Sequence, residues 1–168
     1  MERMNAFGWE IEFNRESTLK AHASMERGGA EVCGCQGCRN WIRVRATVFP
    51  AEVVTVFETL GMALDRETEM GAPMEIVKGR FLYSGWFHFV GRLLSGPPAR
   101  EHVAVIRPHG PVEGGSVERV IHRQVGPGFS IGMISRRDLL PKPFKNQEVV
   151  QLEFTVETPW VLEEPYSG

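Results

Sequence analysis

A chain of 168 residues is long enough for one domain whose core needs no disulfide bonds. Its composition, with 42% hydrophobic and 24% charged residues, is ordinary for a globular protein, and its formal charge of −2 argues against general nucleic-acid binding. No segment approaches the roughly 18 apolar residues of a membrane span and no signal-peptide pattern is present, so we expect a cytoplasmic protein with no membrane partner.

The first part of the chain is predicted to contain one strand and several helical segments. Residues 9–13 alternate apolar and acidic side chains, as a half-buried strand does. A short helix is an option at 17–27. Residues 41–49 fit both a strand and a helix, and we favour the helix because a cysteine pair at positions i and i+3 commonly opens one. Residues 50–60 carry a helical apolar stripe that ends at Gly61, which can adopt the left-handed conformation of a helix stop.

The character of the sequence changes to β from Met74 onward. Short apolar runs are separated by glycine- and proline-rich turns without helices between them, which favours antiparallel pairing. The candidate strands cover residues 74–78, 80–94, 103–107, 116–125, 130–135 and 149–156.

These elements predict a single α+β domain that covers residues 1–168. We expect an antiparallel sheet of about five to seven strands, with a small helical segment at residues 38–70 packed on it. The chain then divides into an N-terminal strand and cysteine loop (1–40), a helical segment (41–70) and the sheet (74–162).

The feature that most needs a chemical explanation is a cluster of the chain's three cysteines, Cys33, Cys35 and Cys38. The C-x2-C spacing of Cys35 and Cys38 lets two thiolates reach one tetrahedral ion, and Cys33 offers a third ligand. The predicted cofactor is zinc, with a soft ion such as Cu(I) as an alternative. The fourth ligand of a structural site would come from one of five histidines, of which His22 is the nearest in sequence.

Two other interpretations of the same thiols remain open. If Cys35 lies at a helix N-terminus, the helix dipole and Arg39 would lower its pKa and favour thiol–disulfide exchange with Cys38. Alternatively, the three thiols only pack beneath the first helix, as small apolar side chains do.

A second candidate site lies in the aromatic run at 80–94. Read as a strand, this run places Ser84, Trp86, His88 and Arg92 on one face, and such a mixture of groups is typical of a small-molecule pocket. The alternative is that this face of the strand only packs against neighbouring parts of the protein and binds no ligand.

The first functional hypothesis is therefore a domain that binds a metal ion through Cys33, Cys35 and Cys38, in a structural or ligand-binding role. The second is an enzyme, either a thiol-redox protein that uses Cys35 and Cys38 or a small hydrolase or isomerase that uses His88. The third is a protein-interaction domain without catalysis, and each of the three leaves room for a homo-oligomer. The sequence does not decide whether the protein is an enzyme.

Overall fold

The computed structural model describes the backbone of residues 1–98, 100–107, 110–135 and 139–168 and, within these, the side chains outside 102–120. The described chain begins with β1 (Glu2–Ala6) and β2 (Trp9–Phe13), followed by α1 (Arg15–Ala23), α2 (Gly29–Cys33), α3 (Gln36–Val48) and α4 (Ala51–Leu60). The strands that follow are β3 (Glu69–Met70), β4 (Met74–Val77), β5 (Arg80–Ser95), β6 (Arg100–Arg107), β7 (Gly110–Val120), β8 (Arg123–Gly126), β9 (Phe129–Ile134) and β10 (Val149–Pro159), with a short 3-10 helix η1 (Lys142–Phe144) before the last.

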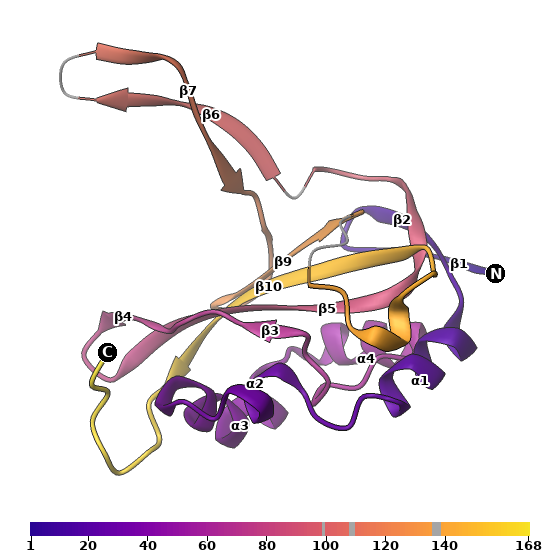
Figure 1. Cartoon of the computed structure of the whole chain (residues 1–168), viewed down its shortest axis with the longest axis horizontal. Coiled ribbons are helices and arrows are strands. Elements are labelled where there is room, and N and C mark those ends of the chain that lie inside the picture. The colour runs from indigo at the N-terminus through magenta and orange to yellow at the C-terminus, as the bar shows by residue number, and fades with distance from the viewer. Residues whose placement is uncertain (99, 108–109, 136–138) are drawn as a thin grey trace.

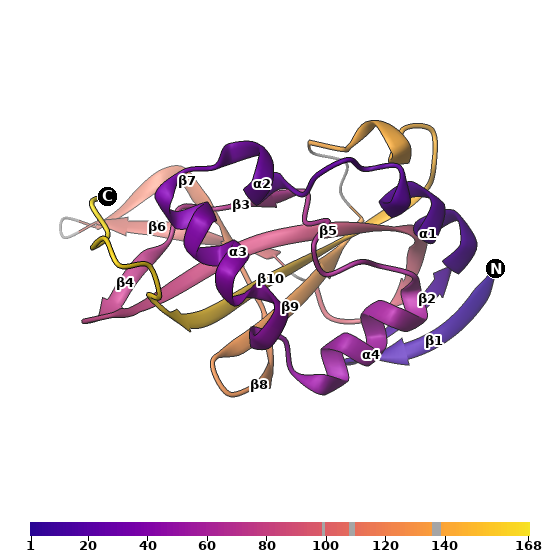
Figure 2. The same ribbon diagram turned by 90° about the horizontal axis from the view of Figure 1, so that it is seen from below.

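The main sheet is antiparallel and is organised around the long strand β5. Its strand order is β1-β2-β5-β10-β9-β8, and β3 and β4 also pair with β5. The helices lie on one face of this sheet, whereas β6 and β7 form a separate two-stranded hairpin that projects from the opposite face (Figure 1). The same helical layer covers β5, β9 and β10 when the protein is seen from below (Figure 2). In the described part of the chain, none of the helices combines the length and the apolar character required to cross a bilayer.

The core between helices and sheet is built from aromatic rings. Trp41 of α3 has no exposed surface and stacks on Phe154 of β10, with ring centroids 5.4 Å apart. Phe57 of α4 meets Phe87 of β5 edge to face at 4.9 Å. Such pairs add to the stabilisation gained from burial alone, so the two helices are fixed firmly against the centre of the sheet.

One edge of β5 is covered partly by strands and partly by α1. β3 and β4 pair with its first half and β2 with its last residues, which leaves a gap near His88 and Val90. In this gap, the imidazole Nε2 of His22 donates to the His88 carbonyl at 2.9 Å, and the Thr18 hydroxyl accepts from the Val90 amide at 3.0 Å. Because buried main-chain groups need partners, α1 completes the hydrogen bonding of the strand.

The predicted α+β class with an antiparallel sheet is confirmed, but the sheet has eight strands rather than five to seven. The strand at 9–13 and the helices at 41–49 and 50–60 are found as β2, within α3 and as α4. Gly61 adopts the expected left-handed conformation, with φ of 79°. Within the expected helical segment, α4 ends at Leu60, and Glu69 and Met70 pair with β5 as a short strand.

Candidate metal centre

The three cysteines lie at the junction of α2 and α3. Cys33 is the last residue of α2, Cys35 is the N-cap residue of α3, and Cys38 lies in the first turn of α3. Between the helices, Gly34 takes a left-handed conformation with φ of 64°, which a residue with a side chain adopts at a cost. This reversal folds the chain back on itself, and the three Sγ atoms lie within 4.8 Å of one another.

The thiols differ in their exposure. Cys33 and Cys35 are exposed, whereas Cys38 is buried at 5% exposure beneath them, and all three are free thiols. Cys33 also lines a pocket of about 340 Å³ together with Val32, Thr68 and Glu69. The cluster is therefore accessible from solvent on one side and closed by protein on the other.

The thiols also differ in acidity. The pKa of Cys35 is lowered, chiefly because the main-chain N–H of Cys38 faces its sulfur, with further contributions from the Cys33 thiol and the Gly37 amide. These amides belong to the first turn of α3, where a helix favours negative charge. Burial, followed by the neighbouring thiols, raises the pKa of Cys38. The cluster thus joins one thiol whose pKa is lowered to one whose pKa is raised.

Buried charges hold α2 against α3. Arg45 of α3 forms an ion pair of 3.1 Å with Glu67, which has no exposed surface, and a second ion pair with Glu31 of α2. The same Glu67 carboxylate accepts from the amide of Ala30, and the Glu67 carbonyl accepts from the amide of Gly29. This network fixes the helix that ends in Cys33.

The first turn of α3 is held by a second set of buried polar contacts. Asn40, which has no exposed surface, donates to the Tyr83 hydroxyl at 3.1 Å and to the Pro159 carbonyl at 3.2 Å, and it accepts from the Val161 amide at 2.8 Å. The Tyr83 hydroxyl in turn donates to the Gly37 carbonyl at 3.0 Å. Burial raises the pKa of Tyr83 to about 12, so this phenol remains a neutral donor at physiological pH.

The end of the chain passes beside the cysteine loop. Gln36, which lies between Cys35 and Cys38 in sequence, donates to the Pro165 carbonyl at 2.7 Å and accepts from the Ser167 amide at 3.0 Å. In Figure 2 the C-terminal segment lies next to β4, near the helical layer. The loop is therefore supported from three sides: by α2, by β5 and by the C-terminal segment.

The structure does not bring His22 to the thiols. Both of its ring nitrogens are engaged within the gap along β5: Nε2 donates to the His88 carbonyl, and Nδ1 accepts from the Ala63 amide at 3.2 Å. The imidazole is 2% exposed, and burial lowers its pKa, which keeps the ring neutral. Among the side chains that the structure describes, the group of potential metal ligands consists of the three cysteines. The side chains of His102 and His109 lie outside the described residues.

The second predicted site is only partly assembled. Trp86 and His88 lie close together on the face of β5 opposite the helices, whereas Ser84 is exposed and Arg92 pairs with Glu12 at 2.6 Å. His88 has no exposed surface; its Nδ1 lies 2.8 Å from the Thr68 hydroxyl. Burial lowers its pKa to about 4, so the imidazole is neutral and shielded from solvent.

Buried partners of Trp86 and His88 escaped the sequence analysis. Glu153 and Gln151 of β10 lie directly opposite Trp86 and His88. Gln151 donates to Glu153 at 2.8 Å, and the same carboxylate pairs with Arg100 at 2.5 Å. In the sequence, Gln151 and Glu153 alternate with Leu152 and Phe154, which indicated the outer face of a strand. Nothing in the sequence indicated that this outer face would be buried.

No family model matches the chain, and no curated protein or solved structure is significantly similar to it. Function is therefore inferred from the geometry of the thiols.

Proposed function

We propose that Cys33, Cys35 and Cys38 bind one thiophilic metal ion of the zinc type, and that this site gives the protein its function as a metal-binding domain. The observation that carries the proposal is the approach of three sulfur atoms to within 4.8 Å of one another. Two thiolates on one tetrahedral zinc ion, with Zn–S bonds of about 2.3 Å, lie roughly 3.8 Å apart. Small side-chain rotations bring the three sulfurs to that separation.

The surroundings favour an ion with one coordination position left to water or an external ligand. Metal binding requires thiolates, and the first turn of α3 already stabilises negative charge on Cys35. His22 would have to give up two hydrogen bonds and leave a buried position to serve as a fourth ligand. A three-thiolate site that keeps an open position binds ligands or polarises water, whereas a closed four-ligand site is structural. Reduced thiols are the normal state in the cytoplasm, which we propose as the setting of this site.

The test is titration of the reduced, metal-free protein with cobalt(II). Thiolate ligation produces charge-transfer absorption in the near ultraviolet, and the visible bands report tetrahedral geometry. We expect saturation at one ion per chain. In each Cys→Ser variant, the charge-transfer absorption should lose the share that belongs to one of the three thiolates. Val32→Ser, a change at an exposed position next to Cys33, is the matched control and should leave the spectrum unchanged.

His22→Gln completes the experiment, because the glutamine amide can still donate to the His88 carbonyl. An unchanged spectrum in this variant means that the histidine is not a ligand, and a loss of tetrahedral bands assigns it as the fourth. Fully reduced thiols that give no charge-transfer absorption with cobalt, and no metal in elemental analysis of the purified protein, would refute the proposal.

Thiol–disulfide exchange is the second candidate, and the pairing of an exposed Cys35 with a buried Cys38 favours it. In such a reaction the Cys35 thiolate attacks a small disulfide and expels one thiolate. Cys38 then loses its proton, attacks the mixed disulfide and expels the second thiolate, which leaves a Cys35–Cys38 disulfide. In a protein with both Cys33→Ser and Cys38→Ser, which lacks either neighbouring thiol, the mixed disulfide on Cys35 should accumulate after treatment with oxidised glutathione. Bound zinc should suppress this reaction in the wild-type protein, which separates the two functions.

A further inference from the structure

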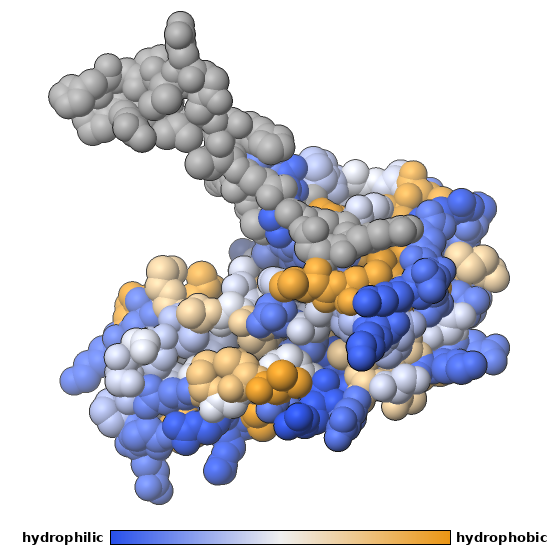
Figure 3. All heavy atoms as spheres, viewed as in Figure 1, coloured by the Kyte–Doolittle hydropathy of each residue, from blue (hydrophilic) through white to orange (hydrophobic). Residues whose placement is uncertain are grey.

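A pocket of about 610 Å³ lies away from the thiols, between the end of β5, the segment that leads to β6, and the end of β9. This volume is within the range of small-molecule sites. More of its lining is apolar than polar, and the apolar part includes Trp9, Leu93, Pro97, Met133 and Ile134. In Figure 3 an apolar patch is visible on the surface near the base of the projecting hairpin.

The wall formed by residues 96–98 is held in place by contacts with Trp9. The indole N–H of Trp9 donates to the Pro97 carbonyl at 2.8 Å, so the segment is tied to the start of β2. Gly96 lies directly on the indole ring: a Cβ at this position would be 2.3 Å from Trp9 Cδ1. Two consecutive prolines further restrict the backbone. A wall fixed in this way does not have to become ordered when a ligand binds, which favours affinity.

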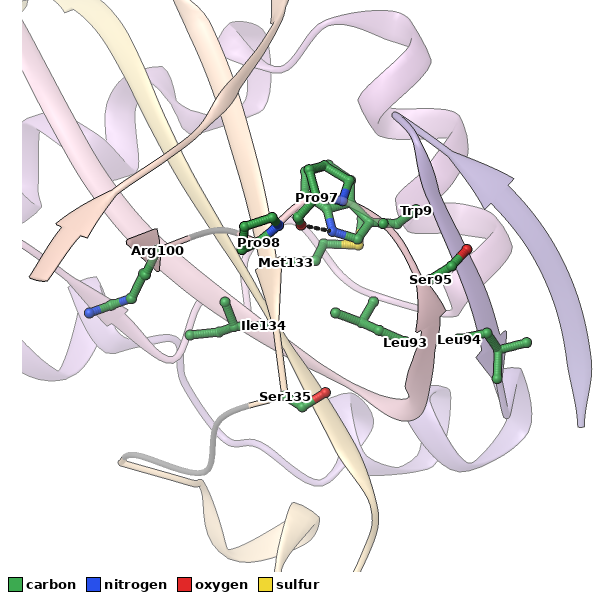
Figure 4. Close-up of a pocket in the computed structure, with 11 residues that line it drawn as sticks. Trp9, Leu93, Leu94, Ser95, Pro97, Pro98, Arg100, Met133, Ile134 and Ser135 are labelled. Carbon is green, nitrogen blue, oxygen red and sulfur yellow. Dashed lines mark hydrogen bonds between the residues drawn. The ribbon is translucent and has the colours of Figure 1, made fainter. Parts of the chain in front are cut away.

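The lining of the pocket is more apolar than polar, and two hydroxyl groups belong to it. Figure 4 shows Leu93 and Ile134 on facing sides, with Trp9, Pro97 and Met133 gathered at one end. Two serines, Ser95 and Ser135, supply hydroxyls among the lining side chains. A bound molecule would therefore meet more apolar than polar surface, and the polar groups within its reach include two hydroxyls.

The charge of Arg100 is already matched. In Figure 4 its guanidinium is directed away from the other labelled side chains, so the pocket meets the aliphatic part of this residue. The guanidinium pairs at 2.5 Å with Glu153, which is 5% exposed. Burial raises the pKa of Glu153, but the His122 ring 3.6 Å away and the hydrogen-bonded Arg100 guanidinium outweigh this effect and lower it, so the carboxylate is ionised. An anionic ligand would lose its hydration here without gaining an uncompensated cation.

From these observations we infer that the protein has a second site, separate from the thiols, that binds a small, uncharged and mainly apolar molecule in the pocket between β5 and β9. The inference does not depend on metal binding, and the two can be tested independently.

The test compares two fluorescent probes with the same ring framework, neutral N-phenyl-1-naphthylamine and anionic 8-anilino-1-naphthalenesulfonate. We expect the neutral probe to saturate at one molecule per chain and to bind at least about tenfold more tightly than the anion, since burying an unpaired charge is costly. In Glu153→Gln, which removes one negative charge beside Arg100, the affinity for the anion should rise and that for the neutral probe should change little. Wild-type protein that prefers the anion, or binds neither probe, would overturn the inference.

Two further measurements locate the probe. Ser135→Trp places an indole in the pocket from an exposed position and should weaken binding of the neutral probe at least about tenfold. The matched control is Thr55→Trp on the exposed face of α4, where binding should be unchanged. In the wild type, the indole N–H resonance of Trp9 should shift during the titration because its acceptor, Pro97, lines the pocket. Saturation without a shift of this resonance, or equal affinities in the two tryptophan variants, would place the probe elsewhere and refute the inference.

Discussion

Arg45 and Glu67, which are 22 residues apart in sequence, form a buried ion pair that ties the helix carrying Cys38 to the segment that anchors α2. Burial outweighs the attraction of Arg45 and raises the pKa of Glu67. The charge of Glu67 therefore depends on Arg45, because a carboxylate at this depth is costly to keep ionised without a cation beside it.

Removing the arginine should be costly and dependent on pH. We expect Arg45→Met to lower the free energy of unfolding by roughly 3–5 kcal/mol at pH 7, because it leaves a buried carboxylate unpaired. A carboxyl whose folded pKa is raised loses its penalty as pH falls, so the deficit relative to wild type should shrink between pH 7 and pH 5. Urea unfolding of both proteins at several pH values measures this difference in the free energy of unfolding.

In the control, Arg39→Met breaks an exposed pair with Glu164 and should cost less than about 1 kcal/mol. A deficit that does not vary with pH would show that Glu67 is not the group affected.

Metal affinity should rise with pH. Each thiol must lose its proton to become a ligand, and burial keeps Cys38 protonated in the metal-free protein. With Cys35 already inclined to ionise, we expect each bound zinc to release between about two and three protons near neutral pH. Isothermal titration in buffers of different ionisation enthalpy counts these protons. Release of fewer than one proton per zinc would mean that the ion is not held by the thiol cluster.

Alkylation should distinguish the three thiols in the metal-free protein. Since the thiolate is the nucleophile, iodoacetamide should modify Cys35 fastest, and Cys38, which is buried and has a raised pKa, slowest. Peptide mapping after brief labelling gives the order, and bound zinc should slow all three reactions. Fastest modification of Cys38 would contradict the acidities described above.

Acid should destabilise the protein through His88. The folded-state pKa of about 4 lies below the value of about 6.5 expected in the unfolded chain. The unfolded state therefore takes up a proton first as pH falls. The contribution of His88 to the free energy of unfolding is fully present above pH 6.5. It is lost progressively as the pH falls from 6.5 to 4, by about 3 kcal/mol in total. We expect urea unfolding of His88→Gln to show a smaller dependence on pH across this interval than that of wild type. Equal slopes would mean that His88 is not the group responsible.

Asn40 should connect the stability of the cysteine loop to that of the C-terminal segment. Asn40→Ala leaves the Pro159 carbonyl and the Val161 amide without their partner, which should cost about 2–3 kcal/mol. Hydrogen exchange should become faster at Val161 and in the first turn of α3. The exposed Asn5→Ala, on β1, is the matched control and should change stability by less than about 0.5 kcal/mol. Unchanged exchange at Val161 in the Asn40 variant would contradict this role.

The sequence by itself determined the features that depend on local pattern. Apolar periodicity identified β2, α4 and the two faces of β10, and Gly61 marked the end of α4. The spacing of Cys33, Cys35 and Cys38 within six residues identified the thiol cluster, because side chains so close in sequence need only a short reversal of the chain to meet.

Only the tertiary structure decided which distant residues meet. His22 completes the edge of β5 because strands on both sides leave a gap there, and a histidine in a polar stretch does not reveal that use. Two contacts between distant residues support the cysteine loop. Arg45 and Glu67 are 22 residues apart in sequence, and Asn40 and Tyr83 are 43 residues apart. The pairing of Trp86 and His88 with Glu153 and Gln151 likewise arose from the register of β5 and β10. Periodicity specifies which side of an element is buried, but the partner on that side depends on how the whole chain packs.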